Sequence, residues 1–346
     1  MSGTAAHAAS GASTVSAAGA ANHPRDLFRL TKPRITLLVL LTAAAGYFLA
    51  AGGHPAPVPM LAALAGIGLV ASGTSGLNQV WERDVDARML RTRRRPIPAG
   101  RVAPGVGWIF TATLAGAGVV FLVAFVNWLT AGLAVLSIVT YVFIYTPLKR
   151  VSSLSTLVGA VPGALPIVGG WTAASGDLGP GAWALFGIMF FWQLPHFLAL
   201  AWLFREDYQR GGLKMLGVDD PDAHQTRVHS VLYASALLPA SLFPVVIGLS
   251  GVFYLVAALA LGVLYGWAAL RFWVRADVSS ARRLFRVSLL YLPILLVVLS
   301  FDRGPYPATA AGAAGPSTVA AAVEAAGPAM EDQASPVAPV AAPSPH

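Results

Sequence analysis

The sequence has no cysteine and few charged residues. The absence of cysteine excludes disulfide bonds, Cys-ligated zinc, iron–sulfur clusters and thioether-attached haem. Charged side chains make up 11% of the 346 residues and hydrophobic side chains 56%, a balance that excludes an ordinary soluble protein. Residues 1–22 contain no arginine and lack a basic start followed by an apolar core, so they are not typical of a secretory signal or a transit peptide.

Five long stretches that are almost free of Lys, Arg, Asp and Glu carry the hydrophobic residues. A helix needs about 20 residues to cross a bilayer, so a stretch twice as long holds two helices. Four stretches then hold two helices each and the short fifth holds one, which predicts an all-α fold with nine transmembrane helices. The last helix is the weakest prediction, because its charge-free core has 15 residues. The stretches are 35–81, 102–148, 151–204 (interrupted by Asp177), 228–270 and 287–301.

The basic residues sort to one side of the expected bundle. The formal net charge is +8, and with nine spans 22 of the 23 Lys and Arg residues fall on one side, which leaves only Arg303 opposite. Because cytoplasmic loops are enriched in Lys and Arg, this predicts a cytoplasmic N-terminus and an extracytoplasmic C-terminus. The sorting also argues against nucleic acid as a partner. A bacterial inner (plasma) membrane fits the missing leader, and a mitochondrial inner membrane is the alternative.

The chain is expected to form one membrane domain with two tails. Residues 25–303 hold all the expected spans, flanked by disordered tails at 1–24 and at 304–346, the second rich in Ala and Pro. Two long charged loops, 82–105 and 205–227, lie on the basic side. Because long polar loops often carry function, these two are the first places to look for chemistry.

The end of the second expected span carries oxygen ligands at four-residue steps. Asn78, Glu82 and Asp86 lie within about 80° of one another on a helix, so they share one face. Mg²⁺ prefers oxygen ligands and often combines a few carboxylates with substrate phosphates. The spacing therefore indicates a divalent-metal site. The alternative is an ordinary helix end stabilised by pairs such as Asp84 with Arg88.

Basic side chains follow on the same expected side. Arg91 and Arg95 belong to a run of four arginines, and guanidinium groups bind phosphate oxygens in bidentate fashion. Lys149 and Tyr145 close the fourth expected span, where Lys149 can anchor a phosphate although Pro147 bends the backbone between the two. With a metal nearby, these groups favour a diphosphate site. The alternatives are basic loops that bind anionic lipid and an interfacial Tyr–Lys anchor.

The sixth expected span contains an ionisable residue. His196 follows Pro195 more than one turn inside the span, and ionisable groups within a membrane are functional candidates. The alternative is a histidine that only forms a hydrogen bond to a neighbouring helix. Beyond the span, Glu206 and Asp207 can complete a second metal shell, or they simply begin a solvated loop.

Taken in order, these motifs resemble the UbiA-type intramembrane prenyltransferase superfamily, and more closely its haem O synthase branch. The resemblance covers residues 30–302, nearly everything except the tails. Other branches place an aspartate where this chain has His196, and this difference favours the haem branch. The matching residues are Asn78, Glu82 and Asp86 of the first acidic motif, Met89, Arg91, Thr92, Arg95 and Pro96 after it, Tyr145 and Lys149, Trp192 to Phe197, and Asp207 with Tyr208.

The resemblance implies transfer of the farnesyl group of farnesyl diphosphate to a vinyl group of haem B, with addition of water, to make haem O. It implies Mg²⁺ held by Asn78, Glu82 and Asp86, with Asp207 on a second ion. We expect His196 to face the haem, as an axial ligand or as a base toward the added water. The residues expected to bind substrate are Arg91, Arg95, Tyr145 and Lys149, with Lys32, Arg34 and Lys214 as weaker candidates.

Two other functions fit parts of the sequence. A prenyltransferase for an aromatic, quinone-pathway acceptor would use the same metal face, but His196 and the Arg-Thr-x-x-Arg-Pro pattern argue against it. A non-enzymatic transporter would have its polar site at the midplane, whereas here the ionisable clusters lie on one side. The expected partners are farnesyl diphosphate, haem B, the lipid bilayer and a downstream haem-modifying enzyme, with no nucleic acid.

Overall fold

The computed structural model describes residues 23–306. The tails expected at 1–24 and 304–346 lie outside the described residues, apart from the few positions nearest the membrane domain. The helices are α1 (Pro24–Leu30), α2 (Pro33–Ala50), α3 (Pro57–Trp81), α4 (Arg83–Arg88), α5 (Pro104–Phe125), α6 (Trp128–Ile138), the π-helix η1 (Val139–Tyr145), α7 (Thr146–Leu148), α8 (Ser155–Ser175), α9 (Pro180–Leu203), α10 (Arg205–Gly211), α11 (His224–Val246), α12 (Val252–Arg275) and α13 (Val278–Phe301).

Within residues 23–306, nine helical segments are long and apolar enough to cross a bilayer, as the charge-free stretches predict. The protein is therefore a multi-pass membrane protein. The fourth segment is composite, because α6, η1 and α7 follow one another without a gap from Trp128 to Leu148. The last, α13, has 24 residues and exceeds its charge-free core, because it begins at Val278 and includes three arginines before the apolar stretch.

Proline and short polar side chains fix where most of these helices begin. Five helices, α1, α2, α3, α5 and α9, have proline at the first position, where the missing N–H needs no partner and the fixed φ suits a helix. Asn127 caps α6 and Asp277 caps α13. Their side-chain oxygens accept hydrogen bonds from Thr130 N at 2.8 Å and from Ser280 N at 2.6 Å. Helix starts thus follow from local chemistry.

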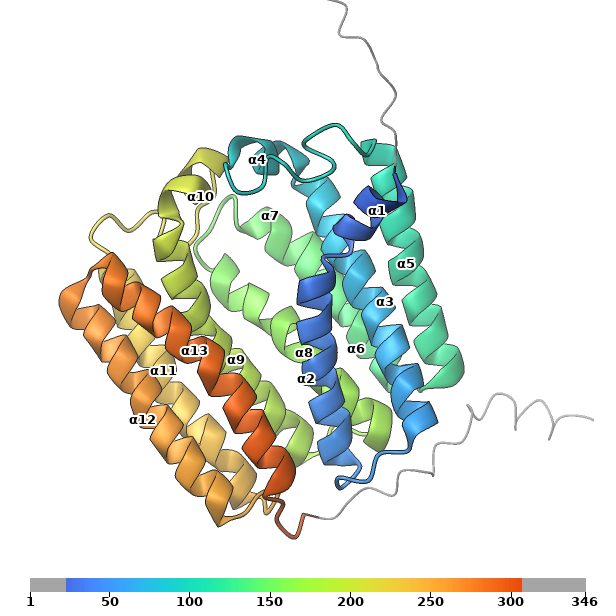
Figure 1. The fold of residues 1–346 in the computed structure, drawn as a ribbon, viewed down its shortest axis with the longest axis vertical. Helices are drawn as coiled ribbons and strands as arrows, with labels where there is room; N and C mark the ends of the chain where they lie inside the picture. Colours follow the sequence, from blue (N-terminus) through green and yellow to red (C-terminus); the bar gives the residue numbers. More distant parts are fainter. Residues whose placement is uncertain (1–22, 307–346) are drawn as a thin grey trace, which may run out of the picture.

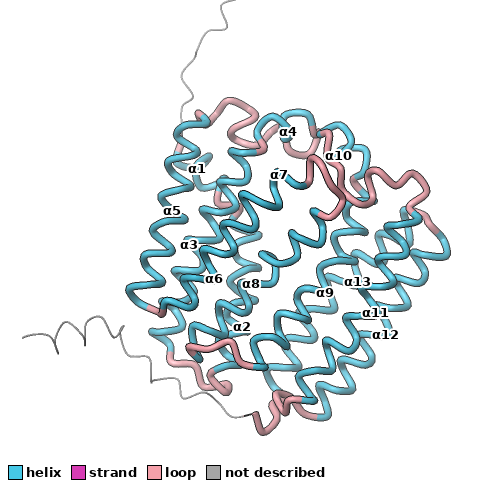
Figure 2. The backbone as a smooth tube through the Cα atoms, turned by 180° about the vertical axis from the view of Figure 1, so that it is seen from behind, coloured by secondary structure: helices cyan, strands magenta, loops and turns pink. Residues whose placement is uncertain are grey.

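The helices form two groups that lie side by side (Figure 1). In the N-terminal group, which runs from α2 to α8, α3 packs along α5 and α2 packs along α8. In the C-terminal group, which runs from α9 to α13, α11 packs against α9 and α12, and α13 packs against the same two helices. The view from behind shows the same division, with α8 and α9 joining the groups (Figure 2).

Two glycines let α2 and α8 approach each other closely. A Cβ atom on Gly46 of α2 would overlap the carbonyl oxygen of Ile167 in α8. Conversely, a Cβ atom on Gly170 of α8 would overlap the carbonyl oxygen of Ala43 in α2. Small residues at such crossings are typical of helices in lipid, where association depends on van der Waals contact rather than on the hydrophobic effect.

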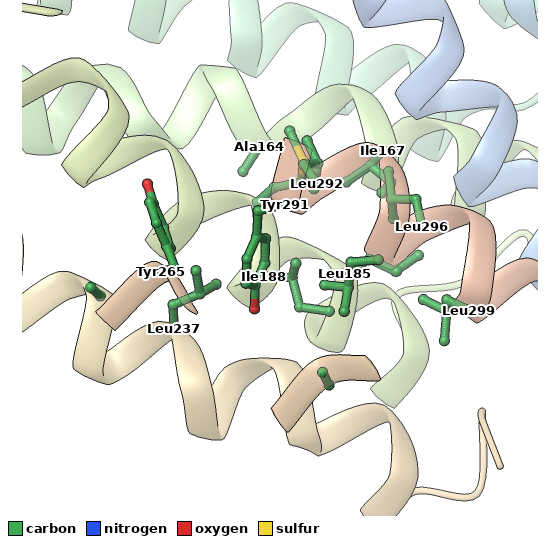
Figure 3. Packing of buried hydrophobic residues seen from close by; sticks show 14 of the residues in the cluster. Ala164, Ile167, Leu185, Ile188, Leu237, Tyr265, Tyr291, Leu292, Leu296 and Leu299 are labelled. Carbon is green, nitrogen blue, oxygen red and sulfur yellow. The ribbon is translucent and has the colours of Figure 1, made fainter. Parts of the chain in front are cut away.

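The largest buried cluster of hydrophobic side chains lies in the C-terminal group and against α8. Leu185 and Ile188 of α9 pack close to α13, and Tyr291 of α13 is fully buried (Figure 3). Tyr265 of α12 is also fully buried, so this core contains phenolic hydroxyls that need hydrogen-bond partners.

The short helices α1, α4, α7 and α10 all lie toward one end of the bundle, which is uppermost in Figure 1. We call it the charged end, because it carries the expected charged loops. At the opposite end, the chain after α13 ties helices together. Asp302 Oδ2 accepts a hydrogen bond from Tyr254 N at 2.6 Å, and Arg303 pairs with Ser250 in an isolated antiparallel bridge. The candidate site described below lies at the charged end.

Candidate metal and diphosphate site

The expected metal face lies where α3 gives way to α4. The helix is interrupted at Glu82 (φ −95°, ψ 9°), which separates the two segments. Asn78 Nδ2 donates to Glu82 Oε2 at 3.1 Å, so these two side chains lie together despite the interruption. Asn78, Glu82 and Asp86 are 3%, 4% and 0% exposed. Oxygen-bearing side chains are thus withdrawn from solvent at this junction.

Each of the three side chains also contacts a basic residue. The contacts are the ion pair of Lys149 with Glu82, the ion pair of Arg95 Nη1 with Asp86 Oδ2 at 2.6 Å, and the hydrogen bond from Lys32 Nζ to Asn78 Oδ1 at 3.4 Å. Buried charges are costly unless they are paired, and these contacts supply the pairing. The structure therefore brings together six of the residues that the sequence assigns to metal and diphosphate.

Lys32 reaches this cluster from an unusual backbone conformation. Its φ of 47° is left-handed, which side-chain-bearing residues rarely adopt, and it occurs at the junction of α1 and α2. Burial, followed by the positive charge of Arg95, lowers the pKa of Lys32 to about 7. An anion beside this amine would favour its protonated form.

The donor atoms fit Mg²⁺. Asp86 Oδ1 is buried and has no hydrogen-bond partner in the described part of the chain, so one carboxylate oxygen is enclosed and unpartnered. Burial raises the pKa of Asp86 against the opposing effect of Arg95. Among residues 23–306, no three His, Cys, Asp or Glu side chains are grouped to hold a metal. With one amide oxygen and two carboxylates, a Mg²⁺ ion here would need substrate oxygens to complete its coordination, as Mg²⁺ sites often do.

Lys149 follows the π-helix η1 and the short helix α7 at the end of the fourth membrane segment. π-Helical turns are rare and often occur at functional sites. Pro147 lies between Tyr145 and Lys149, yet Lys149 Nζ lies 5.0 Å from the centre of the Tyr145 ring. The bend at Pro147 therefore does not keep the ammonium and the ring apart.

Thr146 is a contributor that the sequence reasoning missed. It is fully buried, and its hydroxyl accepts a hydrogen bond from Asn78 Nδ2 at 3.0 Å and donates one to Tyr141 O at 2.8 Å. This contact orients the Asn78 amide so that its oxygen faces Lys32. No spacing rule marks a threonine 68 residues away as the partner of Asn78.

Asp207 holds the loop that follows α4. Its Oδ1 accepts a hydrogen bond from Leu90 N at 2.7 Å, and its Oδ2 accepts one from Arg91 N at 3.3 Å. The Arg91 guanidinium lies 4.5 Å from the centre of the Phe204 ring and donates to Tyr208 Oη at 3.1 Å. In this structure, Asp207 therefore positions Arg91.

Two of the weaker candidates stand apart from the cluster. Arg34 is exposed, and its side chain has no hydrogen bond or ion pair with any described residue. The Lys214 side chain is exposed as well, but its backbone N–H donates to Lys149 O at 2.8 Å. Lys214 thus supports the chain near Lys149 without placing its ammonium on the metal face.

His196 lies on α9 and contacts α13. Its Nδ1 is 2.7 Å from Ser288 Oγ, so the interhelical hydrogen bond that the sequence left as an alternative is present. The ring is stacked against Phe285 at 4.8 Å and against Trp192 at 5.4 Å. Ser288 is a further residue that sequence reasoning missed.

Comparison with known proteins assigns the family. The UbiA prenyltransferase family matches residues 39–294, most of the chain. The chain belongs to the UbiA prenyltransferase family.

Several relatives are similar to this UbiA protein over nearly their whole length. A protein named protoheme IX farnesyltransferase from Solibacter usitatus is 43% identical over 291 residues, which cover 81% of this chain and 99% of that relative. A protein of the same name from Koribacter versatilis is 43% identical over 295 residues, covering 82% of this chain and 95% of the relative.

Solved structures of other UbiA proteins share the fold. A UbiA homologue from Aeropyrum pernix superimposes with a TM-score of 0.60 at 20% identity, covering 78% of this chain and 97% of that one. A UbiA homologue from Archaeoglobus fulgidus, solved with DMAPP and Mg²⁺ bound, gives a TM-score of 0.63 at 15% identity and covers 80% and 99%. The predicted all-α UbiA-type bundle is confirmed by these matches.

Proposed function

We propose that this UbiA protein transfers the farnesyl group of farnesyl diphosphate to a vinyl group of haem B and adds water, which yields haem O. The observation that carries the proposal is the 43% identity to a protoheme IX farnesyltransferase over 99% of that relative. The side chains at the charged end support it, because carboxylates and cations are gathered there as a diphosphate substrate requires.

The first step breaks the allylic C–O bond, and negative charge then grows on the diphosphate. Bound Mg²⁺ would stabilise that charge. We propose that Asn78, Glu82 and Asp86 hold the metal, with Asp207 on a second ion. The unpartnered Oδ1 of Asp86 is the atom that best supports this role.

The basic residues of the cluster are placed to exchange partners when the substrate binds. Without substrate, Arg95 and Lys149 neutralise Asp86 and Glu82. A diphosphate offers oxygen atoms that bind guanidinium and ammonium groups strongly. In the proposed reaction both cations turn to the diphosphate, together with Arg91, and the carboxylate oxygens become free for metal binding. Tyr145, whose ring faces the Lys149 ammonium, would orient it.

The remaining steps join the farnesyl group to the haem and add water. A new C–C bond forms between the farnesyl carbon and a vinyl carbon of the haem, and the resulting cation takes up water and loses one proton. The product gains a farnesyl group and a hydroxyl group, while diphosphate leaves. Such a lipophilic haem suits a downstream haem-modifying enzyme in the same bilayer.

A reaction in vitro tests the proposal. The purified full-length protein in detergent is incubated with haem B, farnesyl diphosphate and Mg²⁺, with EDTA as control, and the haem is followed by mass spectrometry. We expect a metal-dependent gain of one farnesyl and one hydroxyl group. Unchanged haem together with prenylation of an aromatic quinone precursor would overturn the proposal and leave the family assignment intact.

We also propose that the charged end is cytoplasmic and that the protein resides in the cell inner membrane. The support is that 22 of 23 Lys and Arg residues fall on that side of the nine-span arrangement. Because the chain has no cysteine, His54→Cys and Ser153→Cys each create a single label site, both at exposed positions at opposite ends. An impermeant maleimide should label only His54→Cys in cells with a permeable outer envelope, and the reverse pattern would contradict this orientation.

A further inference from the structure

The imidazole of His196 is stacked against two aromatic rings. Its ring centre lies 5.4 Å from that of Trp192 and 4.8 Å from that of Phe285, with interplanar angles of 24° and 28°. Trp192 is itself held, because its Nε1 donates to Ser288 O at 2.8 Å and its carbonyl accepts from Tyr265 Oη at 2.9 Å. Packing therefore fixes the plane of the ring and the direction of both nitrogens.

The hydrogen bonds of the Ser288 hydroxyl indicate which of those nitrogens carries the proton. Ser288 Oγ lies 2.7 Å from His196 Nδ1 and 2.6 Å from Phe285 O. A carbonyl oxygen only accepts, so the single hydroxyl hydrogen lies between Ser288 and Phe285. His196 Nδ1 must then donate to Ser288, and the neutral ring keeps its lone pair on Nε2.

Nε2 of His196 has no partner within residues 23–306, and it is not among the enclosed polar atoms that lack one. Nε2 is therefore not fully enclosed, and the residue as a whole is half-buried. A histidine that only joined α9 to α13 would need Nδ1 alone. The two stacked rings and the fixed tautomer instead hold an unpartnered lone pair in one direction, which is what a metal ligand requires.

We propose that His196 Nε2 is the axial ligand of the haem iron in the acceptor site, and that Ser288 is the positioning residue that keeps Nδ1 protonated. Neutral imidazole is a common iron ligand. Histidines that bind metals almost always donate their other N–H to a fixed acceptor. The inference rests on the proposed function, because it takes haem B as the acceptor. Ligation would hold the vinyl groups in one orientation toward the farnesyl cation.

Haem binding without farnesyl diphosphate tests this proposal. Ferrous haem B is added to the purified full-length protein in detergent, and resonance Raman spectroscopy records the iron–histidine stretching band. We expect the band in the wild type and its loss in His196→Ala. In Ser288→Ala, the band should move to lower frequency because Nδ1 loses its acceptor, and haem affinity should fall about tenfold. Ser288→Thr, which keeps a hydroxyl, should restore both.

Ser241→Ala is the matched control. Ser241 is a fully buried serine of α11 whose hydroxyl pairs with Tyr291 Oη at 2.8 Å and does not contact His196. Its spectrum and affinity should match the wild type. A band that persists in His196→Ala overturns the ligation, and an unshifted band in Ser288→Ala overturns the positioning role. If Ser288→Ala does not fold, Ser288→Cys gives the same comparison with a weak acceptor.

The outcomes also separate this inference from the proposed function. A wild-type protein that shows the band but does not farnesylate haem refutes the function and leaves the ligation standing. A wild-type protein that farnesylates haem without showing the band refutes the ligation and leaves the function standing.

Discussion

The charged end of the N-terminal group and the middle of the C-terminal group bury polar atoms by different means. At the charged end the buried groups include ions, such as Glu82 with Lys149. In the C-terminal group they are neutral hydroxyls. Tyr254 Oη donates to Ser241 O at 2.8 Å, and Ser241 Oγ pairs with Tyr291 Oη at 2.8 Å.

Neutral hydrogen bonds of this kind are complete within the fold and stabilise it. Buried ion pairs lose much of their attraction to desolvation, so they contribute little net stability. Such ion pairs can instead support ligand binding, because a charged ligand can replace one member of the pair. We therefore expect the ions at the charged end to bind substrate and the hydroxyl network to stabilise the fold. Variants at the charged end should change kinetic constants, and variants in the hydroxyl network should change the free energy of unfolding.

The largest effect is expected for Asp86→Asn. The substitution keeps the side-chain shape but removes the charge that pairs with Arg95 and changes the carboxylate to an amide at the unpartnered oxygen position. If the carboxylate holds the metal that stabilises the leaving group, kcat should fall about 100- to 1,000-fold, because groups that stabilise charge in the transition state contribute on this scale. Steady-state kinetics with farnesyl diphosphate and haem B measures it.

Asp84→Asn is the matched control for this variant. Asp84 lies two residues earlier, its side chain is 71% exposed, and among residues 23–306 it pairs only with its neighbour Arg83 at 3.5 Å. Turnover of Asp84→Asn should stay near the wild-type value. Wild-type turnover in Asp86→Asn would contradict the proposed role of this carboxylate in catalysis. The buried ions would then only stabilise the fold, as the hydroxyl network does.

The next largest effect is expected for Lys149→Met. The variant keeps the aliphatic stem but loses the ammonium that pairs with Glu82 and faces Tyr145. A charge-assisted hydrogen bond to the substrate contributes about 1.5–3 kcal/mol, so KM for farnesyl diphosphate should rise at least about tenfold. Lys214→Met should change KM less than about threefold, since its ammonium is exposed. Equal effects of the two variants would contradict the placement of Lys149.

The hydroxyl network should show the opposite pattern. Tyr254→Phe removes the hydrogen bond to Ser241 O, and the free energy of unfolding should fall by about 1 kcal/mol with kcat unchanged. Tyr233→Phe is the control, because the Tyr233 hydroxyl has no hydrogen bond to any described residue. Equilibrium unfolding in mixed detergent micelles measures both. A loss of turnover in Tyr254→Phe at full stability would refute a purely architectural role.

The spans were predictable because the bilayer imposes a simple rule on the sequence. Charge-free stretches predicted all nine membrane segments found within residues 23–306. Local departures from a regular helix were not predictable in this way. Examples are the interruption at Glu82 and the π-helix Val139–Tyr145. Both lie where helices contact one another, as Thr146 contacts Asn78, and such contacts cannot be read from the composition of a single stretch.

The members of the candidate site were predictable from local sequence patterns, but most contacts between them were not. Four-residue spacing predicted one face for Asn78, Glu82 and Asp86. In the structure Asn78 donates to Glu82, and Asp86 lies close enough to Glu82 for their charges to interact. Contacts between distant segments were not predictable, because they depend on packing. The hydrogen bonds of Asp207 to a backbone segment 116–117 residues earlier in the chain are an example, and its place at a second metal stays a prediction.

The smallest expected effect concerns a single proton on Lys32. Burial and the charge of Arg95 lower its pKa to about 7, so at pH 8 the amine is mostly neutral in the free protein. A bound diphosphate favours the ammonium form and raises this pKa, so binding at pH 8 should take up a proton, and at pH 6 the uptake should vanish because the amine is already protonated. Calorimetry of pyrophosphate binding with Mg²⁺, in two buffers of different ionisation enthalpy, counts the protons. Lys32→Met should lower the count at pH 8 by somewhat less than one, whereas Lys214→Met should not. If the number of protons taken up is unchanged in Lys32→Met, Lys32 lies outside the diphosphate site. Arg95 and Lys149 would then be the cations of the cluster that exchange their carboxylate partners for the diphosphate.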